Sequence, residues 1–150
     1  MPAVAPAAGA SASTPTARWK ERTGYRMVRT INVGSSVAAY SHATVSGGLV
    51  FTSGMTPHDP DTGAVRGETI EEQTRLSLAL LERVLAAAGT DTAHLLQVQV
   101  HLDDIDADFA GFDRVYKEMI PAPHPPRATV GSHLPGYRIE LTAIAALPED

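Results

Sequence analysis

The sequence predicts an α+β fold in which one sheet carries two helices on one of its faces. Two segments, at about 69–88 and 106–120, have apolar residues at helical spacing, and strand-like segments around them give the order β-β-α-β-α-β-β. A length of 150 residues suits one domain, and 43% hydrophobic with 19% charged residues is ordinary for a globular protein. Two helices cover only one face of such a sheet, so the other face must be solvated or covered by another subunit.

By composition the chain divides into a leader, a domain and a tail. Residues 1–17 are almost wholly Ala, Pro, Ser, Thr and Gly, and five basic residues against one acidic residue give residues 1–30 a charge of +4. Such a segment has too little bulky apolar surface to offset the entropy of ordering it. We therefore expect residues 1–29 to form a disordered basic leader, residues 30–147 to form one domain, and residues 148–150 to form a tail.

The first two strands are predicted as a hairpin. The β-prone segments 37–45 and 49–53 flank Gly47-Gly48, and a Gly-Gly pair between such segments is typical of a two-residue hairpin turn. Residues 57–67 are rich in turn-forming residues and are expected to be a loop.

Helix signals follow the loop. Thr69 and Glu72 have the spacing of a capping box, Leu80 and Val84 belong to an apolar stripe, and Gly89 is placed to end the helix. The second helix is expected from about Asp106 to Ile120.

Three more strands are expected, at about 94–102, 126–130 and 138–146. The first alternates, with Leu96, Val98 and Val100 on one face and Gln97, Gln99 and His101 on the other. The last is apolar on both faces, which is usual for a strand buried on both sides. We therefore expect an oligomer whose sheets face inward.

Composition and spacing exclude several kinds of site. The chain has no cysteine, which removes thiolate metal sites and thiol nucleophiles. Its six histidines lack metal-site spacing, and it has neither a Gly-x-Ser-x-Gly elbow nor a glycine-rich loop opening a helix. Residues 31–150 carry a charge of −9, which disfavours nucleic acid. We expect no metal, no cofactor, no membrane span or secretory signal, and a cytoplasmic location.

An arginine and a glutamate near the C-terminus are the remaining candidates for chemistry. If segments 126–130 and 138–146 pair antiparallel around a loop near His133, Arg127 and Glu140 face each other across the ladder. Two readings follow from this spacing: a shared ligand site, or a cross-strand ion pair that only stabilises the hairpin.

Nine short motifs in register resemble the reactive-intermediate deaminase family (RidA, also called YjgF), over about residues 30–147. The motifs are Ala39–Ala43, Gly48–Gly54, Asp61–Gly63, Glu72–Thr74, Leu85–Gly89, Val115–Tyr116, Pro126–Val130, Leu134–Pro135 and Ile139–Ala145. The resemblance implies a homotrimer of chorismate-mutase-like fold with sites in the clefts between subunits. It also implies hydrolysis of 2-aminoacrylate and related enamines or imines to 2-keto acids and ammonia, without a cofactor.

The resemblance assigns roles by position. Arg127 matches the arginine that grips the substrate carboxylate, and Glu140 matches the acidic residue that orients or activates water. The substrate-binding positions are Tyr40 lining the cleft, Ser53 and Gly54 bordering it, the Thr129 backbone and Asp113.

Some residues depart from the family pattern. Asp113 stands where many members have asparagine, His42 and Met55 replace frequent glutamines, and the segment from Arg127 to Glu140 is a residue or two short. Two alternatives therefore stay open beside the deaminase: a pathway-dedicated enzyme for a larger imine or enamine, and a non-enzymatic ligand-binding or chaperone-like trimer. A ribonuclease is disfavoured by the acidic body and the lack of a paired-histidine site.

Overall fold

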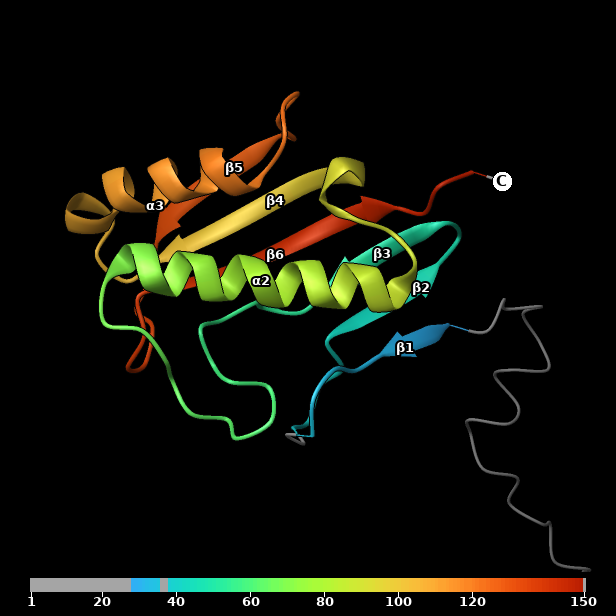
Figure 1. Cartoon of the computed structure of the whole chain (residues 1–150), viewed down its shortest axis with the longest axis horizontal. Helices are drawn as coiled ribbons and strands as arrows, with labels where there is room; N and C mark the ends of the chain where they lie inside the picture. Colours follow the sequence, from blue (N-terminus) through green and yellow to red (C-terminus); the bar gives the residue numbers. More distant parts are fainter. Residues whose placement is uncertain (1–27, 36–37, 150) are drawn as a thin grey trace, which may run out of the picture.

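The computed structural model describes residues 28–35 and 38–149, and within them two helices lie against one face of a single sheet (Figure 1). Strands β1 (Arg29–Ile31), β2 (Ala43–Ser46) and β3 (Leu49–Thr52) precede helix α2 (Ile70–Ala88). A 3₁₀ turn η1 (Thr92–His94), strand β4 (Leu95–Leu102), helix α3 (Ile105–Met119) and strands β5 (Arg127–Gly131) and β6 (Ile139–Ala146) complete the order. The predicted α+β class is confirmed, with β1 as an additional edge strand.

The limits of the leader fall mostly outside the described residues. Residues 1–27 and 36–37 lie outside them, and with these most of the predicted leader and the start of the predicted first strand. The sheet already includes Arg29, and β2 is shorter than predicted because residues 38–42 are irregular. No helix in the described part of the chain is long and apolar enough to cross a membrane.

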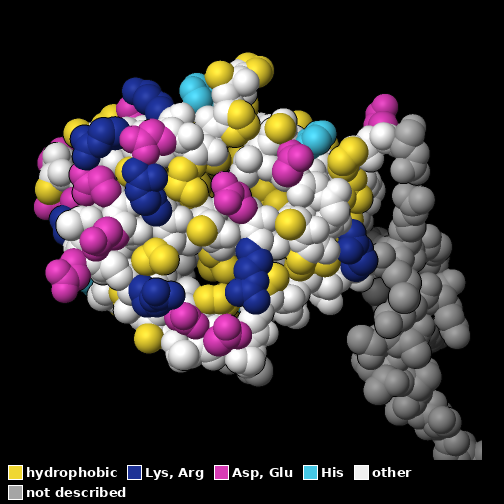
Figure 2. Space-filling model, in the orientation of Figure 1, with side chains coloured by type: hydrophobic (Ala, Val, Ile, Leu, Met, Phe, Trp, Pro, Cys, Tyr) yellow, Lys and Arg dark blue, Asp and Glu magenta, His cyan; other side chains and the backbone are white. Residues whose placement is uncertain are grey.

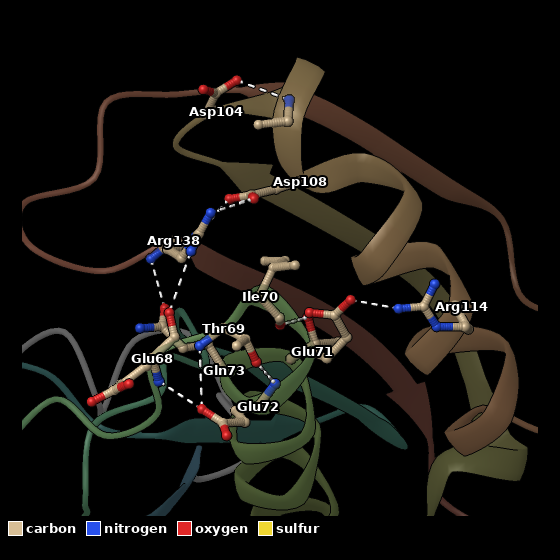
Figure 3. A network of polar contacts seen from close by, with 12 residues as sticks. Glu68, Thr69, Ile70, Glu71, Glu72, Gln73, Asp104, Asp108, Arg114 and Arg138 are labelled. Atoms are coloured by element: carbon tan, nitrogen blue, oxygen red, sulfur yellow. Dashed lines mark hydrogen bonds and ion pairs between the residues drawn. The ribbon is translucent and has the colours of Figure 1, made fainter.

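The local signals that predicted the hairpin and the first helix are all present. Gly47 and Gly48 have φ of 60° and 79°, as a tight hairpin turn requires, and Ser46 pairs with Leu49 across it. Thr69 caps α2, because its Oγ accepts from the Glu72 N–H at 3.1 Å while Glu72 Oε2 accepts from the Thr69 N–H at 3.2 Å. Figure 3 shows this reciprocal pair at the start of the helix.

The sheet order is β1-β2-β3-β6-β4-β5, and this order corrects a prediction about the last two strands. β6 lies in the middle, antiparallel to both β3 and β4, while β5 is the edge strand and runs parallel to β4. The predicted antiparallel hairpin between segments 126–130 and 138–146 is therefore wrong. Its premise failed because β4 forms ladder hydrogen bonds with both strands and separates them.

The core fills the space between helices and sheet. Buried apolar side chains of the helices form one cluster with those of β4 and β6: Leu78, Leu81, Leu85, Phe112, Val98, Val100, Leu141 and Ala143. A register shift between Leu95 and Gln97 turns Leu95 into the core and leaves Leu96 47% exposed, so the predicted inward position of Leu96 is wrong.

Beyond the helices, the second face of the sheet is open in a single chain. The predicted row of Gln97, Gln99 and His101 lies on this face, beside a shallow hollow lined in part by Phe51, Thr142 and Ile144. Phe51 is 42% exposed there. On the helix side, by contrast, acidic and basic side chains of the described residues are interspersed (Figure 2).

Candidate active site

A cleft of about 550 Å³ opens where β3 and β6 meet the irregular segments around them. Five of its lining residues carry the chemistry discussed below: Tyr40, Ser53, Gly54, Tyr137 and Glu140. Four of these five are predicted site residues, so the structure brings most of the predicted cleft together. Tyr137 was not predicted.

Glu140 projects into the cleft because β6 alternates. Ile139 and Leu141 point into the core, so Glu140 points to the opposite face of the sheet. Its Oε2 accepts a hydrogen bond of 2.8 Å from the Tyr137 hydroxyl. Its Oε1 lies against the Cα of Gly54, where a Cβ would come within 1.8 Å of it. The carboxylate is thus held on two sides.

Gly54 reaches Glu140 because the chain beyond β3 stays beside β6. The Met55 N–H donates to the Leu141 carbonyl at 2.6 Å, and the Leu141 N–H returns a bond of 3.1 Å to the Met55 carbonyl. Met55 itself is fully buried, so this departure from the family pattern is a core position. The Ser53 N–H donates to the His42 carbonyl at 2.9 Å, which fixes the other side of the turn.

The entrance of the cleft is aromatic. Tyr40 is 62% exposed at the mouth, and its ring meets the His42 ring edge to face at 6.2 Å. The His42 Nδ1 accepts from the Val33 N–H at 3.3 Å. Burial, with a smaller effect of Arg83, lowers the pKa of His42, so this ring is neutral at pH 7 and supplies no positive charge to the cleft.

Arg127 lies elsewhere, at the start of the edge strand β5. It pairs in register with Val98, whose side chain is buried in the core, so Arg127 points to the helix face of the sheet. Its guanidinium lies 4.7 Å from the Tyr116 ring centre and 5.0 Å from that of Phe112. Such cation–π contacts hold a guanidinium in place.

Asp113 and Lys117 complete this second cluster. One Arg127 nitrogen donates to Asp113 Oδ1 at 3.0 Å, and the Lys117 ammonium lies 2.6 Å from Asp113 Oδ2. The hydrogen bond from Lys117, and then the one from Arg127, lowers the pKa of Asp113, so the carboxyl is ionised at neutral pH. The three side chains together carry one positive charge.

Thr129 lies two residues further along β5, on the same face as Arg127. Its Oγ1 and the Tyr116 hydroxyl are buried and have no hydrogen-bond partner among the described residues. Buried polar atoms of this kind are normally satisfied. The Arg127 cluster therefore has both hydrogen-bonding capacity and positive charge to spare for a ligand.

In one chain, Arg127 and Glu140 are not neighbours. They lie on opposite faces of the sheet, and β4 separates their strands. Two strand spacings across and three residues along β4 put them roughly 10 Å apart in each direction. The cross-strand contact predicted from the hairpin, whether ligand site or ion pair, is therefore absent.

Tyr137 is the cleft residue that the sequence analysis missed. It follows the turn-forming pair Pro135-Gly136 and precedes Glu140 by three residues, and this spacing was the available signal for its role.

Among the described residues, no group of three or more His, Asp or Glu side chains is arranged to hold a metal ion.

The chain is a two-layer α+β protein that has a glutamate in a cleft and an arginine on the edge strand of its sheet. A family model described as endoribonuclease L-PSP, which covers the YjgF/RidA proteins, matches residues 30–147. The chain belongs to this family, as its motifs predicted.

Individual relatives agree with this membership. The chain is 46% identical over 112 residues to the mitochondrial protein mmf2 of Schizosaccharomyces pombe, covering 71% of this chain and 86% of that protein. It is 30% identical over 125 residues to the putative reactive intermediate deaminase TdcF of Escherichia coli, covering 80% and 95%. A solved YjgF-family structure from Neisseria meningitidis superposes with a TM-score of 0.72 at 33% identity, covering 83% of this chain and 98% of that one.

Proposed function

We propose that this protein hydrolyses reactive enamine or imine carboxylates of the 2-aminoacrylate and 2-iminopropionate class to 2-keto acids and ammonia. The observation that carries the proposal is a fixed guanidinium with free donors, at Arg127, together with a fixed carboxylate in a cleft, at Glu140. Membership of a family that includes named reactive intermediate deaminases supports the same reaction.

Hydrolysis of an imine carboxylate requires mainly a group that binds the carboxylate and a group that transfers protons. Arg127 holds the substrate carboxylate through charge-assisted hydrogen bonds. Water adds its oxygen to the imine carbon while one of its protons passes to Glu140. Glu140 passes this proton to the nitrogen, which gives the carbinolamine. The hydroxyl proton then moves through Glu140 to the amine, the C–N bond breaks as the C=O bond forms, and the products are a keto acid and ammonia. Holding water and substrate in attack geometry supplies most of the rate enhancement.

The reaction requires that the two groups meet, and we propose that they meet between chains of a homotrimer. Arg127 at the edge strand of one chain would face the Glu140 cleft of its neighbour. The open sheet face, with Phe51 exposed on it and the row Gln97, Gln99 and His101 beside it, would lie inside the assembly.

A larger imine or enamine is the second candidate substrate. The cleft volume of about 550 Å³ is in the range of pockets that bind drug-sized ligands, and a three-carbon imine needs far less.

The cellular compartment also remains a prediction. The cytoplasm is expected from the sequence, while two relatives from Schizosaccharomyces pombe are named as mitochondrial.

A coupled assay tests the reaction. A serine or threonine dehydratase generates the three- or four-carbon imine in place, and imine decay is followed with and without this protein. Faster decay at substoichiometric protein is expected. If both small imines decay at the spontaneous rate but the protein hydrolyses a bulkier imine, the larger imine or enamine is the substrate. Binding of carboxylates without any turnover would select the non-enzymatic alternative.

Glu140→Gln separates catalysis from binding. The amide keeps the shape but cannot accept the proton from water, so kcat should fall by at least about a hundredfold. Affinity for a stable carboxylate such as pyruvate should change little, because Arg127 supplies that contact. Equal losses in turnover and in pyruvate binding would show that Glu140 only maintains the cleft.

A further inference from the structure

Tyr137 lines the cleft beside Glu140. It lies in the short segment between β5 and β6, directly after Gly136, whose φ of 85° turns the chain. Its hydroxyl donates to Glu140 Oε2 at 2.8 Å, and its side chain is half-buried. The phenol therefore contacts the one carboxylate that the proposed reaction uses.

Three contacts from outside the segment hold Tyr137 and its neighbour Arg138. The His58 ring packs edge to face on the phenol ring at 5.0 Å, and the His58 Nδ1 lies 2.8 Å from Thr56 Oγ1. The next residue, Arg138, is anchored twice. Its backbone N–H donates to Gln73 Oε1 at 2.8 Å, and its guanidinium forms two bonds, of 3.0 and 2.7 Å, to buried Asp108.

Figure 3 shows the anchor of Arg138 between α2 and α3. Asp108 is only 2% exposed, and its charge is paired by the guanidinium of Arg138, whose side chain is 43% exposed. Residues of both helices bind Arg138, the residue after Tyr137. The orientation of the phenol ring is therefore supported by the helices as well as by its own loop. Pre-organised contacts of this kind are what a catalytic carboxylate needs from its supporting residues.

The protonation state of the phenol is also fixed. Burial, followed by the hydrogen bond to Glu140, raises the pKa of Tyr137 to about 12. The hydroxyl consequently remains a donor over the whole neutral and mildly alkaline range. Over that range it donates to Oε2 and does not act as a base.

The other carboxylate oxygen is free. Glu140 Oε1 has no hydrogen-bond partner among the described residues and lies against the Cα of Gly54. A carboxylate with one oxygen occupied and the other open presents one acceptor in one direction. The absence of a side chain at Gly54 leaves the room for this orientation.

We propose that Tyr137 is a positioning residue that clamps Glu140 Oε2, so that Oε1 is the oxygen that takes the proton from the attacking water. The role rests on the proposed function, because it concerns the carboxylate that this reaction would use. In this role, the short segment between β5 and β6 places a hydroxyl beside Glu140, from a residue three positions earlier in the chain.

The contact itself is tested without substrate. In protein labelled with ¹³Cζ-tyrosine, Tyr137→Phe assigns the Tyr137 resonance by its loss. At pH 11, with amide spectra confirming the fold, this resonance should be that of a phenol in the wild type. In Glu140→Gln it should move towards the phenolate, because the carboxylate no longer raises the Tyr137 pKa. Identical titration in the two proteins would overturn the proposal.

The kinetic role is tested in the coupled imine assay. Tyr137→Phe should lower kcat on the order of tenfold, with KM nearly constant and the acid limb of the pH–rate profile moved to higher pH. The matched control is the same change in the Glu140→Gln background, where it should have no further effect on the profile.

Two failures are distinguishable in these experiments. An active wild type whose pH profile is unchanged by Tyr137→Phe overturns the role of Tyr137 alone. A wild type that hydrolyses no imine refutes the proposed function, and with it the kinetic role of Tyr137.

Discussion

The Arg127 cluster and the Glu140 cleft are held in different ways. Arg127 lies on the edge strand, against aromatic rings, and forms an ion pair with the ionised Asp113. Glu140 lies on the central strand, on the opposite face, between the hydroxyl of Tyr137 and the bare Cα of Gly54. Each half of the proposed site is thus held by contacts within the chain, and in one chain the two halves lie on opposite faces of the sheet.

In the proposed reaction the Arg127 half binds the substrate and the Glu140 half carries the chemistry. The Arg127 half is built from charges, so substitutions there should change which anions bind. The Glu140 half is built from close contacts, so small changes of shape there should change turnover.

Arg127→Ala should abolish imine hydrolysis while the chain stays folded. Truncation removes a charged hydrogen-bonding group from a partly desolvated site, and such losses typically cost about thirtyfold or more in binding. Turnover in the coupled assay and thermal unfolding are the measurements. Arg75→Ala is the matched control, because Arg75 makes an exposed pair with Glu118 at 2.6 Å on the helix surface and should leave turnover unchanged. Near-normal turnover in Arg127→Ala would contradict the assignment.

Gly54→Ala should lower kcat by about a hundredfold, since a displacement of about 1 Å in a catalytic group has effects of that size. The added methyl would come within 1.8 Å of Glu140 Oε1 and must push the carboxylate aside. Gly131→Ala is the control, because its methyl would lie 3.3 Å from the Ile105 side chain, away from the cleft. Equal turnover in the two variants would mean that the position of Glu140 does not matter.

Much of the fold was predictable because its signals are local. The Gly47-Gly48 turn, the capping box at Thr69 and the end of α2 at Gly89 each depend on a few adjacent residues, and all three are present. The pairing of β5 was not predictable in this way. Two strands close in sequence favour a hairpin, and only the long-range insertion of β4 between them decides otherwise.

The site shows the same division. Tyr40, Ser53, Gly54 and Glu140 line one cleft as expected, because the motifs that contain them are short and the strands that carry them are adjacent. The relation of Arg127 to Glu140 was mispredicted, since it depended on the wrong strand pairing. Tyr137 was missed because its contact with Glu140 depends on the turn at Gly136 and on the anchor of Arg138.

Asp113→Asn should have a smaller effect, and in the opposite direction. The Asp113 carboxylate competes with a substrate carboxylate for Arg127, so its removal should tighten pyruvate binding on the order of threefold to tenfold. Calorimetric titration measures this change, and Asp106→Asn, in the first turn of the same helix, is the control. Weaker binding would show that Asp113 mainly holds Arg127 in place.

The same variant has a pH signature. The folded-state pKa of Asp113 is lowered below its ordinary value of 3.8, so its stabilising effect is present above that value and is lost as the pH falls through the folded pKa. The melting temperature of the wild type should therefore fall more steeply on acidification below about pH 4 than that of Asp113→Asn. Parallel curves would contradict the ion pair.

Mixing two inactive variants tests most directly whether the site is shared between chains. Arg127→Ala lacks the guanidinium and Glu140→Gln lacks the carboxylate, and equal amounts are unfolded together and refolded. In a trimer whose sites take Arg127 from one chain and Glu140 from the next, about a quarter of the sites recover both groups, so about a quarter of wild-type turnover should return, at three times the mass of one chain. No recovery in mixtures that light scattering shows to be assembled, or a mass near the 15.8 kDa of one chain, would contradict the shared site.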